Sequence, residues 1–172
     1  MVVFDVDDFR SRVVTAARQA IIEVEREIPD SEVCGFALYS DSDATSLSPA
    51  FNCRTHLAKM QAEYPEDPFY FKWSPGEWSH ESVGVEFFDD ISKDMLRFSQ
   101  SAPEGAEFTK YRYHVFSLCV DALKELRKTE LEGVIFAFSV TDSIDPETQI
   151  HWIKEINSPL EAAEFEGWIA QQ

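Results

Sequence analysis

The sequence predicts a single α+β domain with an antiparallel or mixed sheet of about five strands flanked by helices. Amphipathic segments with apolar residues at three- and four-residue steps predict the helices, and two predicted β-hairpins bracket a helical middle. The 172 residues match one globular domain, and a content of 44% hydrophobic and 13% aromatic residues suffices for a packed core. We find no internal repeat, low-complexity tract or linker, and we expect one domain over residues 1–172.

The chain begins with an amphipathic helix. Apolar residues over 9–28 recur at three- and four-residue steps, which places them on one helix face. Asp5 or Asp7 can cap the start, and acidic residues in the first turn suit the positive end of the helix dipole. Pro29 and Asp30 are expected to end the helix.

Short runs of apolar or alternating residues predict the strands. They are bounded by turn residues and lie at 33–40, 45–53, 69–73, 134–140 and 149–156. We expect the first two runs to form one hairpin and the last two to form another. The most apolar of the five, 134–140, is predicted to be a central strand.

The other helices follow from spacing and from start signals. Ser74, Pro75 and Glu77 resemble a helix start, with a cap, a proline in the first turn and an acidic residue three positions after the cap. Ser158 and Pro159 begin the last predicted helix in the same way. The remaining predicted helices cover 54–64, 85–99 and 108–128.

The chain is strongly acidic. It has 15 Lys and Arg against 32 Asp and Glu, a formal net charge of −17, and Lys154 is the only lysine or arginine within 130–172. This charge repels phosphate backbones and anionic lipids, so we expect neither nucleic-acid nor membrane binding. One interpretation is a surface, including Glu161, Glu164 and Glu166, that docks on a basic protein partner. The alternative is that the charge serves solubility alone.

Cysteine and histidine usage predicts a reduced protein without a metal or cofactor site. Cys34 and Cys119 lie among apolar neighbours, as buried thiols do, and the start of the chain lacks a secretory signal, so we expect a cytoplasmic protein. Cys53 and His56 form an isolated C-x-x-H pair, and no second pair completes a zinc site. We find no glycine-rich phosphate loop and no nucleophile motif.

The most distinctive stretch of the chain is rich in tryptophan. It reads FKWSPGEWSHE, in which Trp73 and Trp78 flank Glu77 and His80 follows. Aromatic walls with carboxylates are typical of ligand pockets, and a histidine beside carboxylates can act in acid–base chemistry. The structural alternative is a turn at a helix start whose tryptophans pack on the sheet, which explains the same residues without a ligand.

Five segments together resemble a known family. They are FALYSD at 36–41, PAFN at 49–52, KWSPGEW at 72–78, FSVTD at 138–142 and KEINSP at 154–159. With them the chain resembles the bacterial domain-of-unknown-function 4303 family from the first helix to Pro159, and KWSPGEW is the strongest match. The resemblance implies no activity and no catalytic residue. By analogy of class, small acidic α+β proteins are often immunity proteins encoded beside bacterial toxins, which suggests that an acidic face blocks a basic toxin such as a nuclease.

Two hypotheses of different class follow. The first, which we favour, is a non-enzymatic binding protein, immunity-like or an adaptor, that occludes a basic partner through its acidic surface and any exposed part of the tryptophans. The second is a small-ligand-binding protein or enzyme with a pocket around Trp73, Glu77, Trp78 and His80. A homo-oligomer that uses the same aromatic residues in a symmetric contact is a third reading.

Overall fold

The computed structural model of the protein describes residues 5–29, 32–102, 104–141 and 144–172. Asp30, expected to end the first helix, and Asp142, in one of the family-like segments, lie outside the described residues. The elements, with η for a 3-10 helix, are α1 (Val6–Glu27), β1 (Val33–Ser40), β2 (Leu47–Cys53), α2 (Arg54–Glu63), α3 (Tyr70–Trp73), η2 (Pro75–Glu77), β3 (His80–Glu81), η3 (Val85–Phe88), α4 (Asp89–Ser101), α5 (Ala106–Arg127), β4 (Ile135–Val140), α6 (Pro146–Ile156) and α7 (Pro159–Ile169).

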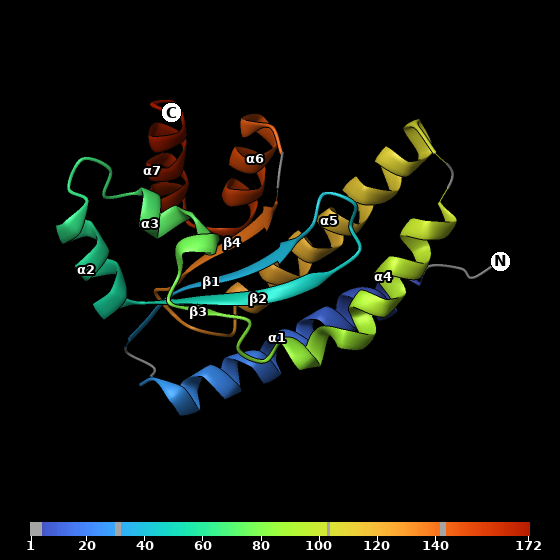
Figure 1. The fold of residues 1–172 in the computed structure, drawn as a ribbon, viewed down its shortest axis with the longest axis horizontal. Coiled ribbons are helices and arrows are strands. Elements are labelled where there is room, and N and C mark those ends of the chain that lie inside the picture. Colours follow the sequence, from blue (N-terminus) through green and yellow to red (C-terminus); the bar gives the residue numbers. More distant parts are fainter. Residues whose placement is uncertain (1–4, 30–31, 103, 142–143) are drawn as a thin grey trace.

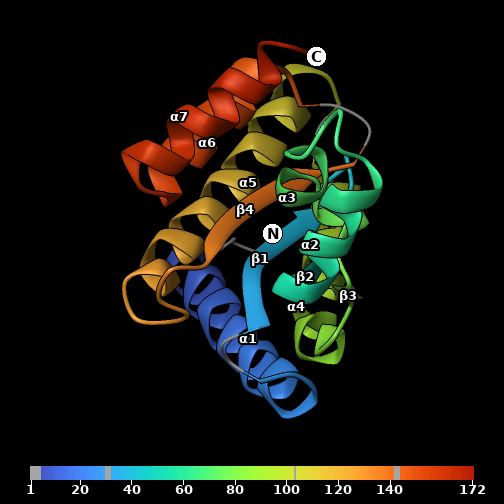
Figure 2. The ribbon, with the colours of Figure 1, turned by 90° about the vertical axis from the view of Figure 1, so that its left-hand side faces the viewer.

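A mixed sheet lies at the centre of this α+β fold. Its four strands have the order β3-β2-β1-β4. β1 pairs antiparallel with β2, which confirms the first predicted hairpin, and parallel with β4, while β2 pairs antiparallel with the short β3. In Figure 1, α1 and α4 lie below the sheet and α6 and α7 above it. Figure 2 shows α5 running alongside β4.

The two faces of the sheet carry side chains of different size. The face toward α1 and α5 is aromatic: the ring of Phe36 lies 4.9 Å from that of Phe51 and 5.3 Å from that of Phe136, centroid to centroid. On the opposite face, beside Ile135, lie small residues, which leave room for bulky side chains from above. These small residues are Gly35, Ala37, Ala50 and Ala137.

Two predicted helix starts are confirmed. Asp5 caps α1 by accepting a hydrogen bond from the backbone N–H of Asp8 at 3.0 Å. Ser158 and Glu161 form a capping box at the start of α7. The start predicted at Ser74 yields only the three residues of η2, and among the described residues Ser74 makes no capping hydrogen bond.

The predicted strand at 149–156 is wrong, because this segment belongs to α6. Asp145 accepts a hydrogen bond from the backbone N–H of Thr148 at 2.9 Å, and Pro146 occupies the first helical position. Proline there suits a helix start as well as a turn, since its missing N–H needs no partner. The buried residues Trp152 and Ile156 lie four apart, which is helical spacing.

The predicted strand at 69–73 is also wrong, because Tyr70–Trp73 form the single turn of α3. The carboxylate of Asp67 accepts the backbone N–H of Tyr70 at 3.1 Å, and the N–H of Trp73 donates to the carbonyl of Phe69 at 3.0 Å. Two of the five predicted strands are thus helical, and the structure adds β3, which was not predicted. The sheet therefore has four strands. The predicted helix at 85–99 begins one turn late, after the 3-10 turn η3.

β4 is an edge strand and not the predicted central strand. Its apolar sequence reflects burial on both faces, since residues of both core clusters come from it. The side chain of Asn157 covers part of the open edge: it accepts the N–H of Phe136 at 2.9 Å and donates to the carbonyl of Phe136 at 2.7 Å. An amide that pairs with strand backbone in this way protects the edge from another strand.

Candidate functional site

The two tryptophans of the tryptophan-rich stretch lie in the core above the small-residue face. Trp73 is 4% and Trp78 is 5% exposed. Gly35 provides the room, because a Cβ added there would lie 2.9 Å from Cη2 of Trp78. The indole N–H of Trp73 donates to Glu164 at 2.9 Å, and its ring packs edge-on against Phe165. The tryptophans therefore anchor the chain on either side of η2.

Glu77 and His80 make contacts with different partners. Glu77 is exposed on η2 and accepts a hydrogen bond from the hydroxyl of Tyr70 at 3.1 Å. His80 is half-buried on β3, and its Nδ1 lies 2.8 Å from Oγ of Ser79. The hydroxyl of Ser79 also donates to Sγ of Cys53 at 3.4 Å. The structure thus connects Glu77 to α3, and His80 to the edge of the sheet.

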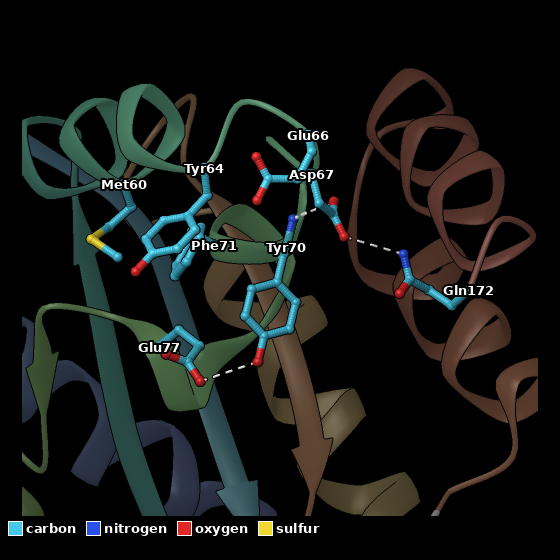
Figure 3. A pocket seen from close by; sticks show the side chains of 8 residues that line it. All are labelled: Met60, Tyr64, Glu66, Asp67, Tyr70, Phe71, Glu77 and Gln172. Atoms are coloured by element: carbon cyan, nitrogen blue, oxygen red, sulfur yellow. Dashed lines mark hydrogen bonds between the residues drawn. The ribbon is translucent and has the colours of Figure 1, made fainter.

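A pocket of about 520 Å³ lies between α2, the segment 64–70, α3 and η2, as Figure 3 shows. We call it the α2–α3 pocket. It is lined by Met60, Tyr64, Glu66, Asp67, Tyr70, Phe71, Glu77 and Gln172. Its volume falls within the range of small-ligand sites. Of the residues predicted to form a site, Glu77 lines this pocket, whereas Trp73, Trp78 and His80 are not among its lining residues.

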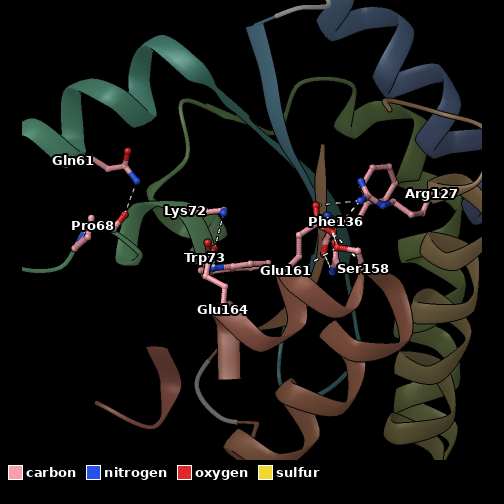
Figure 4. A network of polar contacts seen from close by, with 10 residues as sticks. Gln61, Pro68, Lys72, Trp73, Arg127, Phe136, Ser158, Glu161 and Glu164 are labelled. Atoms are coloured by element: carbon pink, nitrogen blue, oxygen red, sulfur yellow. Dashed lines mark hydrogen bonds and ion pairs between the residues drawn. The ribbon is translucent and has the colours of Figure 1, made fainter. Parts of the chain in front are cut away.

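Hydrogen bonds from side chains to backbone hold the walls of the pocket together. Nε2 of His56, on α2, donates to the carbonyl of Glu77 at 2.9 Å. The amide of Gln61, also on α2, donates to the carbonyl of Pro68 at 2.7 Å (Figure 4). β2 continues into α2 without a loop, so these bonds fix η2 and the segment 64–70 relative to the sheet. The pocket is therefore already formed in the structure.

Aromatic rings form one wall of the pocket. Phe71 is buried, and its ring lies 5.2 Å from that of Tyr64 and 5.1 Å from that of Tyr70, centroid to centroid. Tyr64 and Tyr70 are 45% and 39% exposed, and Phe69 beside them is 37% exposed. Adjacent exposed aromatic side chains are typical of protein-binding surfaces.

The pocket is acidic and holds no compensating cation. Glu66, Asp67 and Glu77 line it, and within the described ranges none of these carboxylates forms an ion pair. The lysines of the adjoining helices, Lys59 and Lys72, pair with carboxylates outside the pocket. The lining therefore has three formal negative charges and no formal positive charge.

Asp67 and Glu77 act as hydrogen-bond acceptors within the lining. Asp67 accepts the indole N–H of Trp168 at 2.9 Å and the amide of Gln172 at 3.3 Å, which connects the segment 64–70 to the end of α7. The hydrogen bond to Glu77 raises the pKa of Tyr70, as do burial and the charges of Glu77 and Asp67. The hydroxyl of Tyr70 therefore stays protonated and can donate to Glu77.

The acidic residues predicted as a docking surface at the C-terminal end form ion pairs within the protein. Two of these pairs appear in Figure 4. The pairs are Glu161–Arg127 at 3.0 Å, Glu164–Lys72 at 2.5 Å and Glu166–Lys154 at 2.8 Å. They connect α7 to α5, α3 and α6, so much of their charge is compensated locally.

Burial affects two of the three cysteine thiols. The cysteines are free; burial raises the pKa of the Cys119 thiol and raises that of Cys34 to about 11, so both are protonated at neutral pH. Cys34 is half-buried, contrary to its predicted burial.

Among the described residues, no group of three His, Cys, Asp or Glu side chains could hold a metal ion. In the same part of the chain, no helix combines the length and apolarity that a membrane span requires.

Comparison with protein families matches residues 13–158 to DUF4303, a domain of unknown function. The chain belongs to this family. The resemblance seen in the sequence segments is thereby confirmed. No curated protein and no solved structure matches the chain. In this DUF4303 protein the KWSPGEW segment has two roles: its tryptophans pack in the core, and its Glu77 lines the pocket.

Most of the pocket was not predicted from the sequence. Two features of the sequence are consistent with a pocket here. Residues 65–82 are rich in proline and aromatic residues, and the predicted helix at 54–64 has an apolar stripe of Leu57, Met60 and Tyr64. None of the residues of α2 is buried, so Met60 and Tyr64 of that stripe remain available to line a pocket. No local pattern could have placed Gln172 there, because only the packing of α7 brings it to Asp67.

Proposed function

We propose that this DUF4303 protein is a non-enzymatic binding protein, immunity-like or an adaptor, that uses an acidic surface to bind a basic protein partner in the cytoplasm. The observation that carries the proposal is the α2–α3 pocket, where carboxylates that have no cationic partner among the described residues adjoin exposed aromatic rings. With a net charge of −17, long-range attraction steers a basic partner toward the protein. The aromatic rings supply the apolar contact that such interfaces need.

The pocket is a better centre for this surface than the C-terminal helix. A carboxylate that already holds a lysine or arginine attracts a second cation less, because the two charges of the pair largely cancel at a distance. Glu161 and Glu164 are in that situation, whereas Glu66 and Glu77 have no cationic partner in the described part of the chain.

The second candidate is a small-ligand-binding protein or enzyme that uses the region of Trp73, Glu77, Trp78 and His80. Its support is the volume of the pocket, about 520 Å³, together with Glu77 in the lining. This candidate predicts that the purified protein retains a metabolite, which native mass spectrometry would detect. A protein that binds only through its acidic surface would show the mass of the chain alone.

The test of the proposed function is recovery of a partner at two salt concentrations. Tagged protein is used as bait in cytoplasmic extract at low and at high salt, and each recovered protein is purified and titrated against the bait. We expect a basic protein that binds at low salt and is released near 1 M salt, where the Debye length falls to about 3 Å. Recovery of the bait alone under both conditions would contradict the proposal.

A matched pair of variants locates the surface. Glu66→Gln/Glu77→Gln removes two pocket charges, and Glu86→Gln/Glu125→Gln removes two exposed charges elsewhere, so both variants have the same net charge. We expect the pocket variant to retain less partner than the control. Equal loss in the two variants would indicate that net charge alone drives association.

A further inference from the structure

We infer that the α2–α3 pocket binds the guanidinium group of an arginine side chain presented by the partner. For the origin of the arginine this inference rests on the proposed function. For the chemistry of the ligand it rests on the lining of the pocket.

The charge of the lining favours a cationic occupant over an anionic one. Glu66, Asp67 and Glu77 face the pocket without an ion pair among the described residues, and Lys59 and Lys72 are engaged elsewhere. An anionic group entering this space would meet only like charge. A cation would form charge-assisted hydrogen bonds, which are about twice as strong as neutral ones.

The rings of the lining favour a planar organic cation over a metal ion. Tyr64, Tyr70 and Phe71 line the pocket, and the faces of aromatic rings attract cations. Tyr70 is held by its hydrogen bond to Glu77, so its ring needs little reordering on binding. A metal ion would instead require several oxygen or nitrogen ligands at one point, which the described side chains do not provide.

Guanidinium fits this combination better than ammonium. It is planar, it stacks on aromatic rings, and its fork of N–H donors matches a carboxylate with two parallel hydrogen bonds. It is also more weakly hydrated than ammonium, so less hydration is lost when it enters the pocket. The exposed ring of Phe69 next to the pocket offers a contact for the residues that flank an inserted arginine.

The indole of Trp168 is a built-in reporter for this site. Its N–H donates to Asp67, which lines the pocket, so a bound cation changes the field at this proton. Trp152 packs against Phe116 and Phe138 in the other core cluster and serves as the internal control. The indole signals in a 1H–15N correlation spectrum are assigned with Trp168→Phe and Trp152→Phe.

The test is a titration of the full chain with Nα-acetyl-arginine amide, followed through these signals. We expect the Trp168 signal to shift in a saturable way while the Trp152 signal stays in place. Nα-acetyl-citrulline amide, a neutral molecule of similar shape, should bind roughly tenfold more weakly or worse, since hydrogen bonds between charged groups are lost. Equal binding of the two amides, or no response of Trp168 to arginine, would overturn the inference.

Variants separate the pocket from general charge. Glu77→Gln keeps an acceptor for Tyr70, and Glu66→Gln removes no observed bond; each should weaken binding of the arginine amide roughly fivefold. Glu125→Gln, on the exposed surface of α5, should leave it unchanged. Thermal unfolding of each variant confirms that the fold is retained. If Glu125→Gln weakens binding as much as Glu77→Gln, the pocket is not the site.

Two further arms identify the source of the cation and separate this inference from the proposed function. A terminally blocked peptide with one arginine flanked by glycines should bind at least as tightly as N-propylguanidine, a free guanidinium compound with the same single charge; tighter binding of N-propylguanidine would overturn assignment to a protein partner. If a basic partner is recovered but binds the Glu66→Gln/Glu77→Gln variant with the same affinity as the wild type, the inference fails and the proposed function stands. If the arginine peptide binds the pocket but no basic partner exists, the proposed function fails.

Discussion

Replacement of Gly35 by alanine tests how the sheet positions the tryptophan-rich stretch. The new Cβ would lie 2.9 Å from Cη2 and 3.1 Å from Cζ2 of Trp78, and 3.2 Å from Cβ of Asn52. Carbon atoms in contact are normally about 3.5–4.0 Å apart. Trp78 and Asn52 are 5% and 1% exposed, so neither can move aside without disturbing the core.

The expected loss follows from two opposing effects. Overpacking of a core costs about 1–3 kcal/mol, and the lower flexibility of alanine in the unfolded chain offsets about 0.4–1 kcal/mol. We therefore expect Gly35→Ala to lower the free energy of unfolding by about 1–2 kcal/mol. In urea, with a dependence of about 2 kcal/mol per M, the unfolding midpoint falls by roughly 0.5–1 M.

Two comparisons make this prediction specific. Gly76→Ala places a Cβ where no described atom beyond its chain neighbours lies within 4 Å, so it should keep the gain from the unfolded chain and raise the free energy of unfolding by about 0.4–1 kcal/mol. Trp78→Phe removes the two ring atoms nearest to the added Cβ, so Gly35→Ala should cost less in that background. A Gly35→Ala variant as stable as Gly76→Ala, or equal costs in both backgrounds, would refute the packing argument.

Two further predictions concern the sheet edge and the turn after β1. Asn157→Ala leaves the N–H and carbonyl of Phe136 unpaired at the edge of β4. We expect thermal or urea unfolding to show a free energy of unfolding lower by about 1–3 kcal/mol. An unchanged stability would show that water replaces both bonds. Burial raises the pKa of Asp41, but hydrogen bonds from Ser46 and Thr45 outweigh it, and the pKa lies below the ordinary 3.8. A carboxyl whose pKa is lower in the folded state contributes stability that is present above pH 3.8 and is lost as the pH falls through the folded pKa. In Asp41→Asn the urea unfolding midpoint should therefore depend less on pH below 3.8 than in the wild type. The two midpoints should differ most at neutral pH.

The helices and the first hairpin could be predicted because their signals are local. Asp5 caps α1, the β1–β2 pairing follows two apolar runs around a turn, and Ser158 with Glu161 forms a capping box. The errors arose where one residue type serves two structures. Pro146 suits a turn and a helix start equally, and the alternation at 69–73 gave no sign that Asp67 would cap a helical turn there.

The acidic character of the chain was evident from composition, but its distribution into paired and unpaired charge was not. Residues 130–172 have the most one-sided composition, yet Glu161 and Glu164 hold cations from α5 and α3. The unpaired carboxylates at the α2–α3 pocket come from a part of the chain with a more even balance of charge. Composition counts charges along the chain, whereas attraction between charges depends on their distance in space.

The sequence by itself determined the α+β class, the helix starts with their own caps, the strong negative charge and the family. These properties depend on residues that are neighbours in the chain or on sums over all residues. Only the tertiary structure decided which side chains form the pocket and which acids stay unpaired. Glu164 meets Trp73 across 91 residues of sequence, and Trp168 meets Asp67 across 101. Such contacts exist only after the helices have packed on the sheet, because nothing in the local chain brings their partners together.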